Sequence, residues 1–285
     1  MIISNNREEN YILSQTKNSL SIFVPSCDKY SDVWKPFFDI FFQEWKKCPY
    51  DIYLGNNCCD FLYEGVHTIS IGDDKGWGDG VIKMLQAVPT QYVLMIFDDL
   101  FIINNIDQDR IENLFSFMIE HNADCMRLNT APIPSKRYDK ANKIGQIRKC
   151  DPYCISAQVA IWKKETLLSL IKPNYTPWDF EFKGSKDEYK NNHLLLGVYN
   201  PAIITLNMIE KGKWQRSSIE YFETQGMHID LSSREVINNL VFPRGIEKKT
   251  TIYSGAESFI SKLKRNALWW IRFNIIARIK NAIYQ

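Results

Sequence analysis

Two adjacent carboxylates, Asp98 and Asp99, follow an apolar run at residues 92–97. The run is too short for a buried helix and is rich in large side chains, so it predicts a central strand. In open α/β sheets, ligands bind just beyond the carboxyl ends of the strands. The acidic pair is therefore the first place where chemistry is expected.

A divalent cation is the natural partner of such a pair. In a solvated crevice both carboxylates are expected to be ionised at neutral pH, and two close negative charges are costly unless a cation lies near them. Mg²⁺ held by one or two carboxylates usually completes its shell with phosphate oxygens. Asp98 and Asp99 thus predict a site for Mg²⁺ or Mn²⁺ that also binds the diphosphate of a nucleotide sugar. The alternative is a plain turn, where Asp is common.

Hydrophobic patterns on both sides of the pair predict the elements that position it. The strand is preceded by apolar residues at helical spacing over 81–88, after a glycine-rich start at 76–80. Upstream, strands are predicted at 20–24, 51–54 and 67–71, and a helix at 35–47. This alternation predicts an α/β fold with a mainly parallel sheet flanked by helices. Residues 129–151, with prolines and mixed charges, predict a hairpin lying over the site.

This order of elements resembles bacterial glycosyltransferases of the GT-A fold, in which a glycine-rich helix start, a helix and a hydrophobic strand precede an acidic metal-binding motif. A second segment carries the resemblance further: a strand-like run at 156–162 with Gln158 and Trp162, a short helix at 163–171, and the hexapeptide Thr-Pro-Trp-Asp-Phe-Glu at 176–181. Within that superfamily the chain is similar to enzymes of capsule, O-antigen or lipooligosaccharide biosynthesis. Phe97 and Leu100 flank the acidic pair, so no strict Asp-x-Asp motif can be written and metal dependence stays open.

The resemblance implies that several residues contact the nucleotide sugar. Pro25, Ser26 and Asp28 lie in the loop after the first strand, which is expected to contact the nucleotide, while turn and helix-capping roles are the alternative. Asp79 either contacts the donor or caps its helix. Lys213 lies in a segment expected to close over the donor diphosphate, and a solvated surface position is its alternative.

A third carboxylate is expected where the acceptor binds. In inverting enzymes of this kind, an acidic residue near 176–181 takes the proton of the acceptor hydroxyl, and such a base can contribute on the order of 10² to 10⁴ in rate. Glu181 is the first candidate and Asp179 the second. The alternative is that both acids favour the dipole of a first helical turn. Trp178 would stack on the acceptor or fill the core.

Length, net charge and cysteine spacing indicate which classes of protein the chain can belong to. A length of 285 residues is enough for one large α/β domain or for a domain with an appendage. A formal net charge of +2 is too small to predict nucleic-acid binding. Seven cysteines without zinc-type spacing predict reduced thiols in the cytosol.

The two ends of the chain are expected to differ from the middle. Residues 1–18 predict an N-terminal extension without a signal peptide, and residues 19–255 the GT-A domain. Residues 256–285 interleave six basic side chains with Trp and Ile, which is typical of an amphipathic helix on an anionic membrane surface. This predicts a cytoplasmic protein held peripherally at the inner face of the cytoplasmic membrane. The alternative is a helix that docks on the catalytic domain or on a second subunit of a homo-oligomer.

Together these features predict a hexosyltransferase-type enzyme that moves a sugar from a nucleotide sugar to a lipid-linked or growing surface glycan, with inversion and with metal assistance. A non-catalytic scaffold that binds carbohydrate or membrane is the competing class, because a fold alone does not establish activity.

Overall fold

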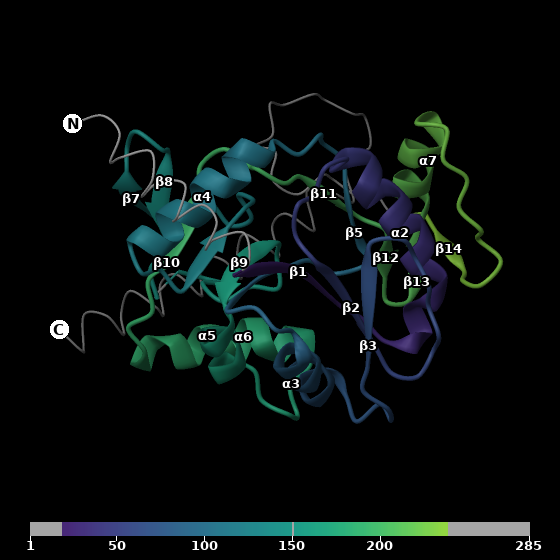
Figure 1. The fold of residues 1–285 in the computed structure, drawn as a ribbon, viewed down its shortest axis with the longest axis horizontal. Coiled ribbons are helices and arrows are strands. Elements are labelled where there is room, and N and C mark those ends of the chain that lie inside the picture. Colours follow the sequence, from purple (N-terminus) through teal and green to yellow (C-terminus); the bar gives the residue numbers. More distant parts are fainter. Residues whose placement is uncertain (1–18, 150, 239–285) are drawn as a thin grey trace, which may run out of the picture.

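A nine-stranded sheet forms the centre of the fold, in the order β3-β2-β1-β4-β9-β6-β10-β8-β7 (Figure 1). The computed structural model describes residues 19–149 and 151–238. All of these strands run in one direction except β8 and β9, so the predicted mainly parallel sheet is confirmed. The strands are β1 (Leu20–Pro25), β2 (Ile52–Asn56), β3 (Val66–Ser70), β4 (Tyr92–Met95), β6 (Cys125–Arg127), β7 (Lys136–Asp139), β8 (Ile144–Gln146), β9 (Ala160–Lys163) and β10 (Leu195–Val198).

Helices cover both faces of this sheet, as Figure 1 shows. One face packs against α2 (Ser31–Glu44), α4 (Gln108–Glu120) and α7 (Arg216–Thr224). The other packs against α3 (Trp77–Ala87), α5 (Lys164–Leu170) and α6 (Pro177–Asp187). Two short 3₁₀ turns, η1 (Asp28–Tyr30) and η2 (Glu188–Lys190), precede α2 and follow α6.

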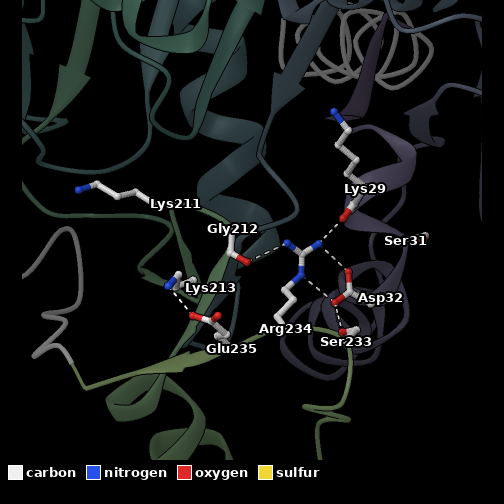
Figure 2. A pocket seen from close by; sticks show the side chains of 9 residues that line it. All are labelled: Lys29, Ser31, Asp32, Lys211, Gly212, Lys213, Ser233, Arg234 and Glu235. Carbon is white, nitrogen blue, oxygen red and sulfur yellow. Dashed lines mark hydrogen bonds and ion pairs between the residues drawn. The ribbon is translucent and has the colours of Figure 1, made fainter.

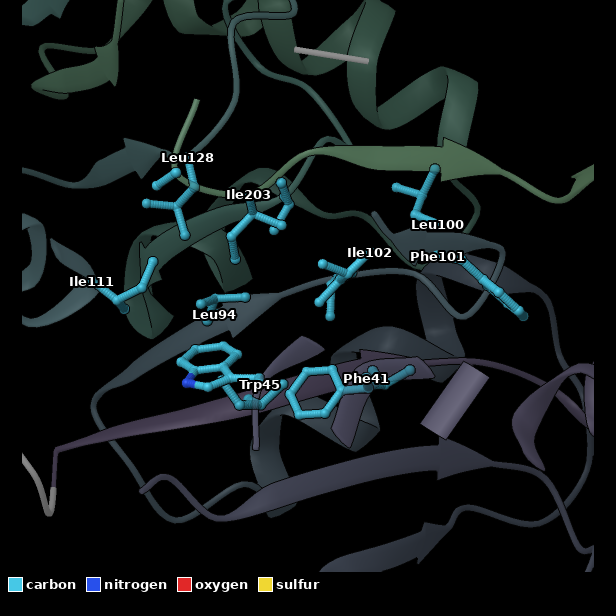
Figure 3. Packing of buried hydrophobic residues seen from close by; sticks show 14 of the residues in the cluster. Phe41, Trp45, Leu94, Leu100, Phe101, Ile102, Ile111, Leu128 and Ile203 are labelled. Carbon is cyan, nitrogen blue, oxygen red and sulfur yellow. The ribbon is translucent and has the colours of Figure 1, made fainter. Parts of the chain in front are cut away.

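Alternation along the central strands divides the core into two. In β1, Ile22 and Val24 belong to the core under α2, whereas Phe23 between them belongs to the core under α3. The period of two in a strand sends successive side chains to opposite faces, and both faces of this strand are buried. Figure 3 shows part of the larger core, where Phe41 of α2 and Trp45, the residue that follows this helix, lie near Leu94 of β4.

Two smaller sheets bring a late segment of the chain beside the acidic pair. β5 (Leu100–Ile102) follows the pair directly and is antiparallel to β11 (Thr205–Asn207). Next to it, Met208 N donates to the backbone oxygen of Asp99 at 2.8 Å. A three-stranded sheet then forms from β12 (Ile209–Glu210), β13 (Lys213–Gln215) and β14 (Val236–Ile237).

Some expectations from the sequence need correction or fall outside the description. The hairpin at 129–151 forms as β7 and β8, but its placement over the site is wrong, because β8 pairs with β10 and extends the sheet at its edge. α2 begins at Ser31 instead of residue 35, directly after η1, so Pro36 lies inside the helix. The segments 1–18 and 256–285 lie outside the described residues, and the predictions about them remain predictions.

Candidate active site

A cavity of about 840 Å³ opens beyond the carboxyl ends of β1, β2 and β4, the position at which the sequence predicted a ligand. Its walls come from the loops after these three strands, from the start of α3 and α6, and from the β12–β13 turn. Its polar, charged and aromatic lining side chains include Ser26, Lys29, Tyr30, Asn57, Asp74, Asp98, Asp99, Gln158, Trp178, Glu181, Glu210 and Lys211.

Asp98 is buried at the base of this cavity, with only 4% of its surface exposed. Its Oδ2 accepts a hydrogen bond from the Ser26 hydroxyl, and Ser26 Oγ in turn accepts one from Trp34 Nε1 at 2.7 Å. Burial and, second, the charge of Asp99 raise the pKa of Asp98 to about 8. The expectation that both acids are ionised in a solvated crevice is therefore wrong for Asp98, because the loop after β1 and α2 remove it from water.

The acidic pair fits a divalent cation whose shell is completed by ligand oxygens. A buried carboxyl whose pKa is raised partly by the adjacent Asp99 is a group that a bound cation would return to its ionised form. Among the described residues, no cluster of three or more His, Cys, Asp or Glu side chains could hold a metal. A cation here would have Asp98 and Asp99 as its acidic ligands and would take the others from a bound ligand, as Mg²⁺ commonly does.

Glu181 lies on the cavity wall, as expected of an acceptor base. It projects from the first half of α6, and its Oε1 accepts hydrogen bonds from Ser156 Oγ at 2.9 Å and from Ala157 N at 2.8 Å. The segment before β9 thus fixes the orientation of the carboxylate. Asp98, Asp99 and Glu181 line one cavity, although the acidic pair follows β4 and Glu181 belongs to α6.

Asp179 has a different position and does not line the cavity. It is the third residue of α6, and its carboxylate and the Thr176 side chain form a capping box at the start of the helix. A second contact is an ion pair with Lys183 at 2.8 Å. The helix-terminus alternative therefore describes Asp179, whereas Glu181 alone of the two faces the cavity.

Of the three residues predicted to contact the nucleotide in the loop after β1, only two line the cavity. Pro25 and Ser26 line the cavity, but Asp28 does not. The Asp28 carboxylate accepts hydrogen bonds from the backbone N–H groups of Asn57, Cys58 and Cys59. Burial raises its pKa, but these hydrogen bonds outweigh burial and lower the pKa below its usual range. Asp28 is thus a loop anchor that positions Asn57, which does line the cavity.

Asp79 is also outside the cavity lining, and it forms an ion pair with Lys83 at 2.8 Å one turn along α3. The glycine-rich start of α3 has a packing reason. A Cβ at Gly78 would lie 2.0 Å from the backbone oxygen of Lys172, because the loop after α5 crosses the helix start closely. Backbone oxygens of Pro173 and Tyr175 accept hydrogen bonds from Asp79 N and Gly78 N, so these N–H groups do not face a phosphate.

A smaller cavity of about 480 Å³ adjoins the first, and Lys213 lines it instead of the larger one. Figure 2 shows that Lys213 forms an ion pair with Glu235. It also shows Arg234 at the centre of the residues that line this smaller cavity. Arg234 donates to the backbone oxygens of Lys29 and Gly212 and to the Asp32 carboxylate. Its guanidinium carbon also lies 4.5 Å from the centre of the Tyr30 ring.

Sequence reasoning gave no role at the site to Lys29, Tyr30 or Asn57, although Lys29 lines both cavities and the other two line the larger one. No local motif marks these three residues. Lys211, in the segment expected to close over the diphosphate, lines both cavities, and Gln158, one of the residues that carry the resemblance, lines the larger one. Arg234 carried no sequence signal either, because its partners are far away in the chain. Arg127 does not line either cavity; it is buried and donates to the backbone oxygens of Tyr153 and Cys154.

Six cysteines lie in the described part of the chain, and all six are free thiols. In the same part of the chain, no helix has the length and apolar character needed to cross a membrane.

No protein-family model matches the sequence, and a search of curated proteins finds no match. Among solved structures, the chain is similar to the 1–349 fragment of S. aureus TarS, with a TM-score of 0.46 and 12% identity over 65% of this chain and 59% of that one. The same fragment in complex with UDP-GlcNAc gives a TM-score of 0.45 and 13% identity over 65% and 57%. The mannosyltransferase PcManGT from Pyrobaculum calidifontis, in complex with GDP-Man and Mn2+, gives 0.42 and 10% over 64% and 54%. The chain thus spans less than two thirds of the length of these three chains.

Proposed function

We propose that this chain is a glycosyltransferase that moves a sugar from a nucleotide-sugar donor to a glycan acceptor. The observation that carries this proposal is one cavity lined by the Asp98–Asp99 pair at the end of β4 and by Glu181 of α6. Its volume of about 840 Å³ lies within the usual range for small-molecule sites. Lys29 and Lys211 add positive charge to the same walls, which suits the phosphates of the donor.

The proposed reaction is a single displacement at the anomeric carbon of the donor sugar. A hydroxyl oxygen of the acceptor forms a bond to this carbon while the bond to the diphosphate oxygen breaks. The bonding pair leaves on the nucleoside diphosphate, and Glu181 takes the hydroxyl proton. Attack from the side opposite the leaving group inverts the anomeric configuration. The hydrogen bonds from Ser156 and Ala157 hold the Glu181 carboxylate in place for this transfer.

The donor diphosphate would lie at the acidic end of the cavity. Asp98 and Asp99 would hold a Mg²⁺ or Mn²⁺ ion there, and such an ion, when bound, supplies positive charge that stabilises the leaving diphosphate. Ser26 fixes the Asp98 side chain through its hydroxyl. Lys29 and Lys211, at the boundary with the smaller cavity, would neutralise phosphate charge from the other side.

The proposed acceptor is a lipid-linked or growing glycan of the bacterial surface, such as capsule, O-antigen or lipooligosaccharide. Residues 256–285 would hold the enzyme at the inner face of the cytoplasmic membrane, where such acceptors are assembled, and a homo-oligomer is the alternative use of this segment. Their basic and aromatic composition supports this part of the proposal.

A panel of nucleotide sugars tests the proposal directly. Purified full-length protein is heated with each compound, with and without Mn²⁺, and the unfolding temperature is followed; a ligand at about 100 times its Kd stabilises the folded state by about 2.7 kcal/mol. At least one donor should protect the protein, and it should be hydrolysed slowly to sugar and nucleoside diphosphate. Asp109→Asn, which changes an exposed acid on α4, is the matched control for replacements in the cavity. Binding of glycans without binding of any nucleotide sugar would instead establish the scaffold function.

A further inference from the structure

Two large aromatic side chains stand exposed on α6 next to the cavity. Trp178 is 73% exposed and Phe182 is 55% exposed. They are four residues apart, so they lie on the same side of the helix, about 6 Å apart along its axis. Exposed apolar side chains that occur singly need no explanation. Two aromatic side chains next to each other beside a cavity are a candidate contact surface for the ligand of that cavity.

The exposure of Trp178 and Phe182 does not come from loose packing of α6, because other residues hold the helix firmly. Phe180, between the two aromatics in sequence, is fully buried and packs against Trp77 with ring centres 5.7 Å apart. One turn later, Gly184 faces Ile155 so closely that an added Cβ would lie 3.1 Å from its Cγ2. The capping box at Thr176 fixes the start of the helix. α6 is therefore held by its inner face, and packing within the described chain does not require Trp178 and Phe182.

Trp178 and Phe182 lie at the boundary between the cavity and the open surface. Trp178 is one of the residues that line it, as is Glu181, whereas Phe182 is not and lies one turn further along the helix. The aromatic row thus begins beside the proposed base and continues onto the open surface. A ligand whose reactive end reaches Glu181 would extend over Phe182.

The chemistry around this row fits sugar rings better than acyl chains. The C–H face of a pyranose stacks on an aromatic ring, and its hydroxyls bond to carboxylates, so aromatic rings around an acid are suited to a glycan. Tyr153, which is partly exposed, is a third aromatic near the same acid. Burial and, second, the charge of Glu181 raise the pKa of Tyr153, so its phenol stays neutral and able to donate. An acyl chain would instead favour a groove of aliphatic side chains, and neither member of the pair is aliphatic.

We propose that Trp178 and Phe182 form an acceptor platform on which two consecutive sugar residues stack, Trp178 under the sugar that carries the reacting hydroxyl and Phe182 under the next one. This inference rests on the proposed function, since it takes Glu181 as the group that faces the hydroxyl. It defines the acceptor as an oligosaccharide of at least two residues and excludes a free monosaccharide or a bare lipid as the preferred acceptor.

The test compares acceptor length with the loss of each aromatic ring. Full-length protein is screened on a printed array of bacterial oligosaccharides, and the best ligand is then tested as its one- to four-residue fragments by calorimetry. The wild type should bind the two-residue fragment more tightly than the one-residue fragment. Phe182→Ala should reduce this gain by about 3- to 10-fold, and Trp178→Ala should weaken binding of every fragment by a similar factor, while Trp178→Phe restores most of it. Leu62→Ala, at a residue that is 98% exposed outside both cavities, should bind every fragment like the wild type.

Several outcomes would overturn the platform. Equal binding of one- and two-residue fragments by the wild type would do so, as would alanine variants that bind all fragments normally while melting normally. A change in oligomeric state, or in sedimentation with liposomes, caused by loss of the aromatics would assign them to a subunit or membrane contact instead. A different result would contradict the proposed function and leave the platform standing. In that case the protein would bind no nucleotide sugar but would still bind longer oligosaccharides more tightly than shorter ones.

Discussion

Arg234 and Asp32 lie 202 positions apart in the sequence, yet Arg234 donates two hydrogen bonds to this carboxylate, from Nε to Oδ2 at 2.7 Å and from Nη2 to Oδ1 at 2.6 Å. The same guanidinium bonds to backbone oxygens in η1 and in the β12–β13 turn. Lys29, Tyr30 and Lys211 belong to these segments and line the larger cavity, whereas Arg234 does not. Arg234, which lies outside the larger cavity, therefore connects two segments that form part of the walls of that cavity.

Arg234→Lys should separate the role of this charge from the role of its geometry. Lysine keeps the positive charge, but it cannot make the two-point contact with Asp32 and the two carbonyl bonds together. We expect the free energy of unfolding to fall by about 1–3 kcal/mol and the donor affinity to weaken several-fold. Urea unfolding and calorimetric titration with the donor measure both. Lys35→Gln, which breaks an exposed ion pair on α2, is the control and should change little. Equal behaviour of the two variants would remove the assigned role of Arg234.

Asp28→Asn tests whether Asp28 anchors a loop or contacts the nucleotide. Loss of the carboxylate that holds the N–H groups of residues 57–59 should lower the free energy of unfolding by roughly 1–3 kcal/mol. Because the folded-state pKa of Asp28 is lowered, this contribution is present above its unfolded pKa of about 3.9 and is lost as the pH falls further. The difference between wild type and variant should therefore be constant near pH 7 and shrink below about pH 4. A loss of donor affinity with unchanged stability would instead indicate a direct contact.

Local sequence patterns predicted those parts of the site whose position is set by the strand or helix in which they lie. A short apolar run located the end of β4 and hence the acidic pair, and the hexapeptide at 176–181 located Glu181. The rest depends on contacts between distant segments. Burial of Asp98 follows from Ser26 and Trp34, and no sequence pattern reports that these side chains meet it. Asp179 and Glu181 are both acids near one helix start, and only the packing of α6 decides which of them faces the cavity.

Asp98→Asn and Asp99→Asn test the acidic pair. Each amide keeps the shape of the side chain but cannot become a negatively charged ligand of a cation, so donor turnover and Mn²⁺ binding should fall severely. Asp98→Asn should not lower the free energy of unfolding near pH 8, because burial of a carboxylate is costly and the amide avoids it. Turnover with and without EDTA, together with direct titration of Mn²⁺, measures these effects. Full turnover in EDTA would show that the pair works without a metal, and normal turnover of both variants would show that the pair is not part of the site.

Removal of residues 256–285, which lie outside the described residues, tests the membrane prediction. An amphipathic basic helix binds through apolar burial plus attraction to anionic lipid of about 1 kcal/mol per basic residue near the surface. The shortened protein should keep donor binding but should no longer sediment with liposomes that contain anionic lipid. Added salt should weaken attachment of the full chain, since exposed charges are screened. Unfolding or a new oligomeric state of the shortened protein, with no liposome binding by the full chain, would assign the segment to packing.

Glu181→Gln and Asp179→Asn together test which acid is the base. Glutamine keeps an oxygen that can accept the hydrogen bonds from Ser156 and Ala157, so the fold and the donor affinity should be preserved. It cannot take a proton, and transfer to the acceptor should therefore fall on the order of 10²- to 10⁴-fold. Asp179→Asn should lower the unfolding temperature slightly, because it weakens the capping box and the contact with Lys183, and should leave the transfer rate close to that of the wild type. Single-turnover transfer at saturating donor, with unfolding temperature measured alongside, distinguishes the two. A large loss of transfer in Asp179→Asn with normal transfer in Glu181→Gln would exchange the roles, and normal transfer in both would exclude a base on α6.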